Sequence, residues 1–135
     1  MATTVATGVG RTAIVNTNDQ NNKELLIVLT ATNPIPTSGI IDIDISSHAG
    51  CTATGATVYC ISAEICGSST PTVSVSGSFL RISNLIGLYV APGARVEFTL
   101  VHDCSSLVPD VGAAATLSVY TRFTYPETNT IYDLD

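Results

Sequence analysis

The sequence has few positive charges and no long apolar segment. It contains five basic residues against eleven acidic ones, which gives a formal net charge of −6, and Lys23 is its single lysine. A basic patch that could neutralise phosphates is therefore missing, and we do not expect nucleic acid as a partner. The longest apolar run, residues 25–29, is far shorter than the roughly 20 residues of a membrane-spanning helix, so we expect no membrane span.

Sequence motifs for catalysis and cofactor binding are also missing: there is no G-x-S-x-G, no P-loop and no G-x-G-x-x-G after a predicted strand. His102 and Asp103 are adjacent, and neighbouring side chains of a strand point to opposite faces, so they do not form the orienting pair of a catalytic triad. His48 and His102 are interpreted as surface or loop residues. Asp42 and Asp44 are not accompanied by a further oxygen-rich cluster such as an EF-hand loop, so they are interpreted as a solvated strand face, with calcium binding as the alternative. We expect neither an enzyme nor a bound cofactor or metal.

The composition is that of one folded domain. The chain has 135 residues, of which 45% are hydrophobic and 12% are charged, and this balance excludes intrinsic disorder. A chain of this length ordinarily folds around one core. Residues 1–10 contain neither a basic region nor a continuous apolar stretch, so we do not expect a secretory signal there.

Alternating apolar and polar residues predict strands rather than helices. In residues 41–45 isoleucines alternate with aspartates, which is typical of a strand with one buried face. Residues 95–100 and 115–124 alternate in the same way, and residues 24–32 are apolar on both sides, as expected of a central covered strand. Weaker candidates are 12–16, 57–61, 72–76, 79–83 and 87–90. Turn signals separate these segments, which predicts an all-β fold: an antiparallel jelly-roll or Greek-key β-sandwich of about eight or nine strands.

Both ends of the chain fall outside this strand pattern. We divide the chain into an N-terminal arm, residues 1–11, a sandwich domain, residues 12–125, and a C-terminal tail, residues 126–135. The arm suits an extended segment that pairs with a sheet edge of another copy. The residues expected to make this subunit contact are Val5, Val9, Thr12 and Ile14. Fraying, the usual state of chain ends, is the alternative for both segments.

The four cysteines are Cys51, Cys60, Cys66 and Cys104, and their spacings contain no C-x-x-C and no histidine at ligand spacing, so we do not expect zinc. They are either buried thiols in strands or candidate disulfide partners, because three of them lie in a Gly/Ser/Thr-rich stretch whose loops need a cross-link. Four cysteines allow three pairings, between which the sequence does not choose. A bridge to a neighbouring copy is a further alternative.

The small number of charged residues and the absence of catalytic sequence motifs favour a structural subunit over an enzyme. With almost no lysine to protect the sheet edges, we expect other copies of the chain to cover them. The protein is then a structural subunit of a self-assembling extracellular or surface filament joined by strand donation. Its expected partner is the chain itself, and its expected location is either extracellular or on the surface of a cell or spore.

Four segments, 12–16, 25–32, 89–100 and 117–125, resemble in their order the subunits of bacterial endospore appendages, the Ena fibres. The resemblance implies jelly-roll subunits with a flexible N-terminal connector that stack into extracellular fibres bridged by disulfides. The connector of that family carries cysteines, whereas residues 1–50 contain none here. Any disulfides must therefore use the four cysteines further along the chain.

A sugar-binding or surface-ligand-binding β-sandwich module is the alternative function. Such a module would use the polar loop 16–22 together with Tyr120 and Arg122, which share one face of the long strand near the C-terminus. The chain has no tryptophan and five tyrosines, so an aromatic platform for sugar stacking is not evident from the sequence.

Overall fold

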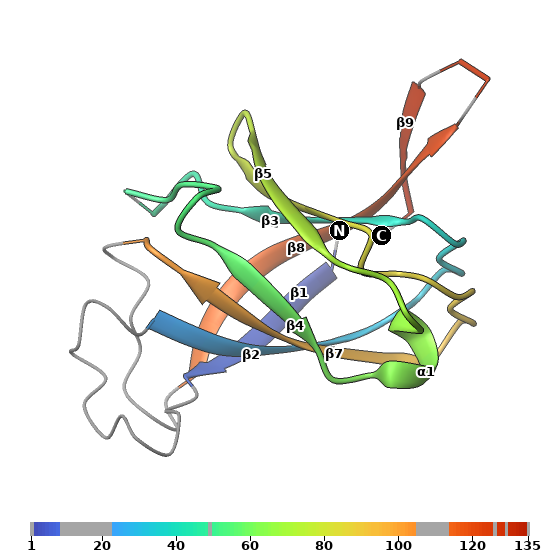
Figure 1. The fold of residues 1–135 in the computed structure, drawn as a ribbon, viewed down its shortest axis with the longest axis horizontal. Coiled ribbons are helices and arrows are strands. Elements are labelled where there is room, and N and C mark those ends of the chain that lie inside the picture. The colour runs from blue at the N-terminus through green and yellow to red at the C-terminus, as the bar shows by residue number, and fades with distance from the viewer. Residues whose placement is uncertain are drawn as a thin grey trace.

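Nine strands and one short helix make up the part of the chain that the computed structural model describes, which is residues 2–8, 23–48, 50–104, 114–125, 127–128 and 130–134 (Figure 1). The elements are β1 (Ala2–Gly8), β2 (Lys23–Thr30), β3 (Ile40–Asp44), β4 (Thr57–Cys60), α1 (Ala63–Cys66), β5 (Thr72–Ser76), β6 (Phe79–Ser83), β7 (Arg95–His102), β8 (Ala114–Tyr125) and β9 (Thr130–Asp133). All of the strand pairs among these residues are antiparallel.

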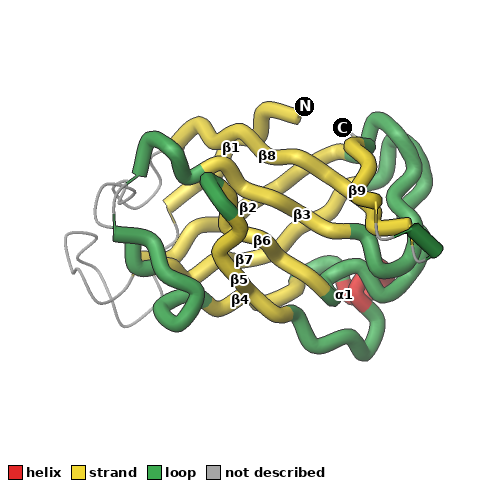
Figure 2. The backbone as a smooth tube through the Cα atoms, turned by 90° about the horizontal axis from the view of Figure 1, so that it is seen from above, coloured by secondary structure: helices red, strands yellow, loops and turns green. Residues whose placement is uncertain are grey.

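The strands form two layers. β4, β7 and β2 make one layer and β8, β3, β6 and β5 make the other, while β1 pairs with both β2 and β8 and joins the layers at one rim. Consecutive strands lie mostly in opposite layers, which is the connectivity of a jelly roll. Figure 2 looks onto the layer that contains β8, β3 and β6. The predicted antiparallel β-sandwich is confirmed.

The core lies between the two layers and follows the alternation of the strands. Leu25 and Ile27 of β2, Phe98 of β7 and Ile41 and Ile43 of β3 are all 0% exposed. Burying a side chain of this kind stabilises the fold by about 1.5–3 kcal/mol. The opposite side of β2 is less covered than the sequence predicts, because Leu26 and Val28 are half-buried.

The helix α1 was not predicted, since four residues are too few to show a helical period. It lies between β4 and β5, and its Ile65 carbonyl accepts hydrogen bonds from the backbone N–H groups of Gly87 (3.1 Å) and Leu88 (2.8 Å). A Cβ atom at Gly87 would overlap the backbone carbonyl oxygen of Cys66. Glycine at position 87 therefore permits the close approach of the β6–β7 connection to α1.

Two other segments differ from their predictions. Residues 87–90, predicted as a strand, make only an isolated bridge between Val90 and Ile35 in the described chain. The C-terminal tail contains a strand, β9, which forms a hairpin with β8 that extends away from the sandwich (Figure 1). The tail is held in place by the backbone N–H of Leu134, which donates to the Thr121 carbonyl (2.7 Å).

The N-terminal segment lies in the chain's own sheet. Ala2–Gly8 forms β1, in which Val5 lies opposite Thr116 of β8. Val9, Thr12 and Ile14, the other predicted contact residues, lie outside the described residues, as do the predicted strand 12–16 and the loop 16–22. The described part of the arm is thus paired within one molecule, with β8 along residues 2–7 and with β2 along residues 6–8.

Candidate functional site

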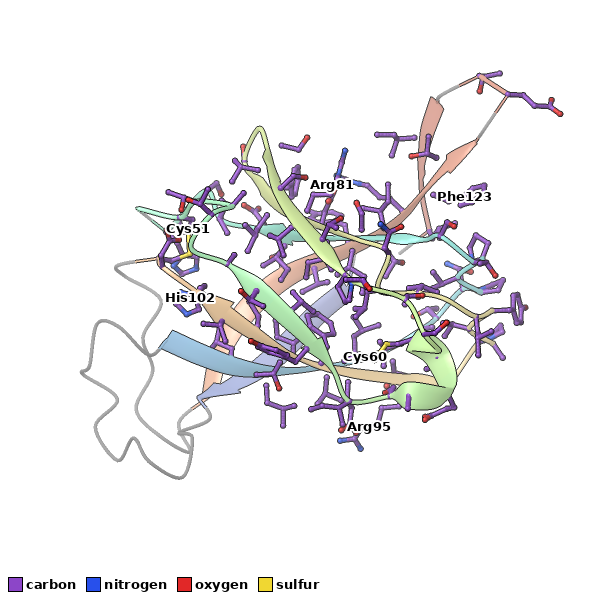
Figure 3. All side chains as sticks on the ribbon, viewed as in Figure 1. Cys51, Cys60, Arg81, Arg95, His102 and Phe123 are labelled. Carbon is purple, nitrogen blue, oxygen red and sulfur yellow. A yellow bond between two sulfur atoms is a disulfide. The ribbon has the colours of Figure 1, made fainter. Side chains whose placement is uncertain are left out.

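The candidate site lies on the outer face of the β8-β3-β6 layer. The strand register places Asp42 of β3 directly opposite Arg81 of β6 and, on its other side, opposite Tyr120 of β8. Ile41 and Ile43 point into the core, so alternation along β3 directs Asp42 to the outer face. Figure 3 shows Arg81 on the upper side of the sandwich and Arg95 of the other layer at the bottom.

Asp42 is buried under two arginines. Its Oδ1 accepts from Arg81 Nε at 2.9 Å, and its Oδ2 accepts from Arg81 Nη2 at 2.8 Å and from Arg122 Nη1 at 2.6 Å. The Asp42 side chain is 0% exposed, whereas those of Arg81 and Arg122 are 18% and 14% exposed. Bidentate pairing of this kind fixes both the position and the plane of a guanidinium. The prediction of a solvated face is therefore wrong at Asp42.

Two aromatic rings flank the second arginine. The Arg122 guanidinium carbon lies 4.5 Å from the centroid of the Phe79 ring and 4.9 Å from that of Tyr120. The two rings meet edge to face, with centroids 5.5 Å apart and planes at 82°. Cation–π contacts to both rings hold Arg122 between them. We call the surface formed by Phe79, Arg81, Tyr120 and Arg122 over Asp42 the aromatic–arginine face.

Arg81 keeps hydrogen-bonding capacity on this face. A guanidinium has five N–H groups, and those of Arg81 donate two hydrogen bonds to Asp42, one from Nε and one from Nη2. Among the described residues no other acceptor contacts Arg81, and its side chain remains partly exposed. The hydrogen bonds to Asp42 raise the pKa of Arg81 further above its ordinary value, although burial opposes this. Arg81 is thus a charged donor in a fixed orientation.

Asp44 lies on the same outer face at the end of β3. Its register partner is Phe79, and its Oδ1 accepts a hydrogen bond from the Ser46 backbone N–H at 2.8 Å. Hydrogen bonds from the Ser46 side chain and backbone hold the pKa of Asp44 below its ordinary range, with a smaller contribution from His48. Asp44 is part-exposed, so the predicted solvated face describes this residue but not Asp42.

The cysteines form two disulfides within the chain, Cys51–Cys104 and Cys60–Cys66, and no described cysteine is free. The disulfide alternative is confirmed, and the interpretation as buried thiols is wrong. Cys51–Cys104 ties the end of β7 to the β3–β4 connection, and Cys60–Cys66 ties β4 to α1. Disulfides are typical of proteins that work in oxidising compartments outside the cell.

Residues near the first disulfide differ from the sequence interpretation. His102 is not a surface residue: it is 4% exposed, and its Nδ1 accepts the Cys104 backbone N–H at 3.0 Å. Burial raises the pKa of Asp103, but this is outweighed by hydrogen bonds from the Thr52 hydroxyl and backbone N–H, so the pKa lies below its ordinary range. These contacts are structural, since they close the end of the sandwich around Cys51–Cys104.

Three residues of the face were not identified as functional from the sequence. Tyr120 and Arg122 were named as candidates for a binding module, but Phe79, Arg81 and Asp42 were not grouped with them. The available signal was the parity of each strand, which puts all five on outward positions. What the sequence did not supply was the strand order that makes β8, β3 and β6 neighbours.

No group of three or more His, Cys, Asp or Glu side chains within the described ranges is arranged to hold a metal ion. Across the same residues, no helix is long and apolar enough to cross a membrane.

Two solved structures are similar to this chain. One is the carbohydrate-binding module CBM3b from the cellulosomal cellobiohydrolase 9A from Clostridium thermocellum, with a TM-score of 0.44 and 14% sequence identity, over 99% of this chain and 98% of that chain. The other is a mutant of the same module, with a TM-score of 0.41 and 16% identity, over 89% of this chain and 91% of that one. No protein-family model matches the chain, and no curated protein matches it significantly.

The prediction of a filament subunit joined by strand donation is wrong. It required an N-terminal arm that inserts into a neighbouring copy, whereas β1 pairs within its own molecule, with β8 along residues 2–7 and with β2 along residues 6–8. The alternative, a binding module, is developed below.

Proposed function

We propose that the chain is a carbohydrate-binding β-sandwich module and that its ligand lies on the aromatic–arginine face. The observation that carries this proposal is the buried carboxylate of Asp42, which holds Arg81 and Arg122 in fixed orientations beside two aromatic rings. A pre-oriented donor binds with a smaller loss of side-chain freedom than a mobile one. The face thus offers rings for the C–H side of a sugar and N–H groups for its hydroxyls.

The face is suited to a ligand that lies across the strands. Tyr120, Asp42, Arg81 and Ser74 are register partners on four adjacent strands, β8, β3, β6 and β5. At about 4.8 Å between neighbouring strands, this row spans about 14 Å. That length exceeds a single sugar ring, so we expect an oligosaccharide or polysaccharide rather than a monosaccharide.

We infer binding without catalysis. Asp42 is the most deeply buried acid on the face, and both of its oxygens are occupied by guanidinium donors. These hydrogen bonds give the Asp42 carboxylate a structural role, because neither of its oxygens is left without a guanidinium partner. The two disulfides support a module that works outside the cell, and we place it at a polysaccharide-bearing surface.

Retention on insoluble polysaccharides tests this function. The panel contains cellulose, chitin, xylan, mannan and starch, and the variants are Phe79→Ala, which removes one ring, and Arg81→Lys, which keeps the charge but loses the planar fork. Tyr59→Ala is the matched control, because Tyr59 is 51% exposed on β4 of the other layer. Thermal unfolding of each variant verifies that it is folded.

We expect wild type and Tyr59→Ala to be retained on at least one polymer. Each of the two face variants should weaken retention about fivefold, the size of effect that one aromatic or charged contact supplies. Absence of retention on every polymer, or equal retention of all four proteins, would overturn the proposed function.

A further inference from the structure

Asp44 borders the aromatic–arginine face. It lies two residues from Asp42 on the same side of β3, a separation of about 7 Å along the strand. In the β3–β6 register it is the direct partner of Phe79, and the next pair on the same face is Asp42 with Arg81. A ligand chain that contacts Phe79 and Arg81 therefore passes beside the Asp44 carboxylate.

The Asp44 carboxylate is charged and fixed in place. The Ser46 backbone N–H donates to its Oδ1 at 2.8 Å, and the hydrogen bonds from Ser46 keep its pKa below the ordinary range. His48, in the turn that follows β3, adds a further attraction to the charged form. At neutral pH a ligand on this face thus meets a full negative charge at the end of β3.

The described charges of the face balance one another. Arg81 and Arg122 contribute two positive charges, and Asp42 and Asp44 contribute two negative ones. The whole chain carries a formal charge of −6, so no long-range attraction for a polyanion adds to the local balance. Without the Asp44 charge, the same four residues would present a net positive surface.

We propose that Asp44 makes the aromatic–arginine face selective for neutral saccharides by repelling chains that carry carboxylate or sulfate groups. This inference rests on the proposed function and names the class of ligand for the same site. The hydroxyl oxygens of a neutral saccharide accept hydrogen bonds from the remaining N–H groups of Arg81, and such a chain brings no charge near Asp44. An acidic chain would gain electrostatic attraction to Arg81 but would place a negative charge beside the negative Asp44 carboxylate, and this repulsion lowers the affinity.

Asp44→Asn tests this selectivity, because the amide has the shape of the carboxylate and its oxygen still accepts from Ser46. The probes are the neutral polymer that wild type retains best, the same polymer carrying carboxymethyl groups, and the same polymer carrying hydroxyethyl groups as a neutral substituent control. Glu97→Gln is the matched variant. It changes the net charge equally, but Glu97 lies on β7 of the other layer beside Arg95, with 2.7 Å between Arg95 Nε and Glu97 Oε1.

We expect wild type to bind the hydroxyethyl polymer at least fivefold more tightly than the carboxymethyl polymer at low salt. Asp44→Asn should reduce this ratio about fivefold and leave the affinity for the neutral polymer unchanged, whereas Glu97→Gln should behave as wild type. If wild type binds the carboxymethyl polymer equally well, or if Asp44→Asn and Glu97→Gln change the ratio equally, the inference is overturned while the proposed function stands. If wild type binds no polymer, the proposed function itself fails.

Discussion

Replacing Asp42 with asparagine is the sharpest test of the ion-pair cluster under the candidate site. Asp42 is 0% exposed, and it neutralises two guanidiniums that are themselves only 18% and 14% exposed. Asn keeps the shape of the side chain but removes the charge, which leaves both arginines in a poorly solvated environment. Removal of one partner from a buried ion pair typically costs 3–5 kcal/mol, and because both arginines retain some contact with water we expect about 3 kcal/mol here.

Urea unfolding under oxidising conditions measures this loss. With a denaturant dependence of about 1–3 kcal/mol per molar for small proteins, a loss of about 3 kcal/mol lowers the unfolding midpoint by about 1–3 M. The matched variant is Asp44→Asn, which changes the same residue type on the same strand face. Asp44 is part-exposed and keeps its Ser46 hydrogen bond as Asn, so we expect a change of about 0.5 kcal/mol or less.

Equal midpoints for the two variants would refute this reasoning, because the large difference follows from the burial of Asp42 under both arginines. A midpoint for Asp42→Asn at or above that of wild type would likewise show that the carboxylate is not the charge that holds Arg81 and Arg122.

Three further predictions concern stability. Removing Cys51–Cys104 by Cys→Ser at both positions should lower the free energy of unfolding by about 4 kcal/mol. Removing Cys60–Cys66 should lower it by about half as much, because that disulfide joins residues 6 apart and Cys51–Cys104 joins residues 53 apart. Thermal unfolding of the two variants compares these losses. Gly87→Ala should lower the unfolding free energy by about 1–3 kcal/mol, measured by urea unfolding, because its Cβ would overlap a backbone carbonyl. Asp103→Asn should lower the free energy of unfolding by about 1 kcal/mol at pH 7. Since the folded pKa of Asp103 lies below the unfolded value, this contribution is complete above about pH 4 and is lost as the pH falls through the folded pKa. The difference in unfolding free energy between wild type and variant should therefore shrink as the pH is lowered below about 4.

The fold was predictable because strand alternation depends on local sequence alone. Ile41 and Ile43 on one side of β3, and Val96 and Phe98 on one side of β7, identify the buried faces without knowledge of any partner strand. The short helix α1 was not predictable in this way. It is fixed by contacts with the distant Gly87 and by the Cys60–Cys66 disulfide rather than by a helical pattern.

The site was only partly predictable because its contacts cross between strands that are far apart in the sequence. Asp42 meets Arg81 at a separation of 39 residues and Arg122 at a separation of 80 residues. Alternation correctly put Asp42 on the outer side of its strand, but it did not show that two long side chains from neighbouring strands cover that side. The Tyr120–Arg122 pair was found because both residues lie on one strand.

The pairing of β1 also depended on information beyond local sequence. Ala2–Gly8 has the composition of a strand that pairs with a sheet edge, and it does pair with β2 and β8. The sequence does not distinguish whether that edge belongs to the same molecule or to a neighbour, because the backbone hydrogen bonds are the same in both cases. The filament prediction was wrong at this step.

The most direct measurement of the central claim is a titration followed by nuclear magnetic resonance, in which an oligosaccharide from the retained polymer is added to isotope-labelled protein. We expect saturable shifts of the Arg81 side-chain Nε–H signal and of the backbone amides of β3, β6 and β8, with Arg95 and β4 on the opposite layer unchanged. Shifts confined to the β4-β7-β2 layer, or no shifts from any oligosaccharide of the panel, would contradict the assignment of carbohydrate binding to the aromatic–arginine face.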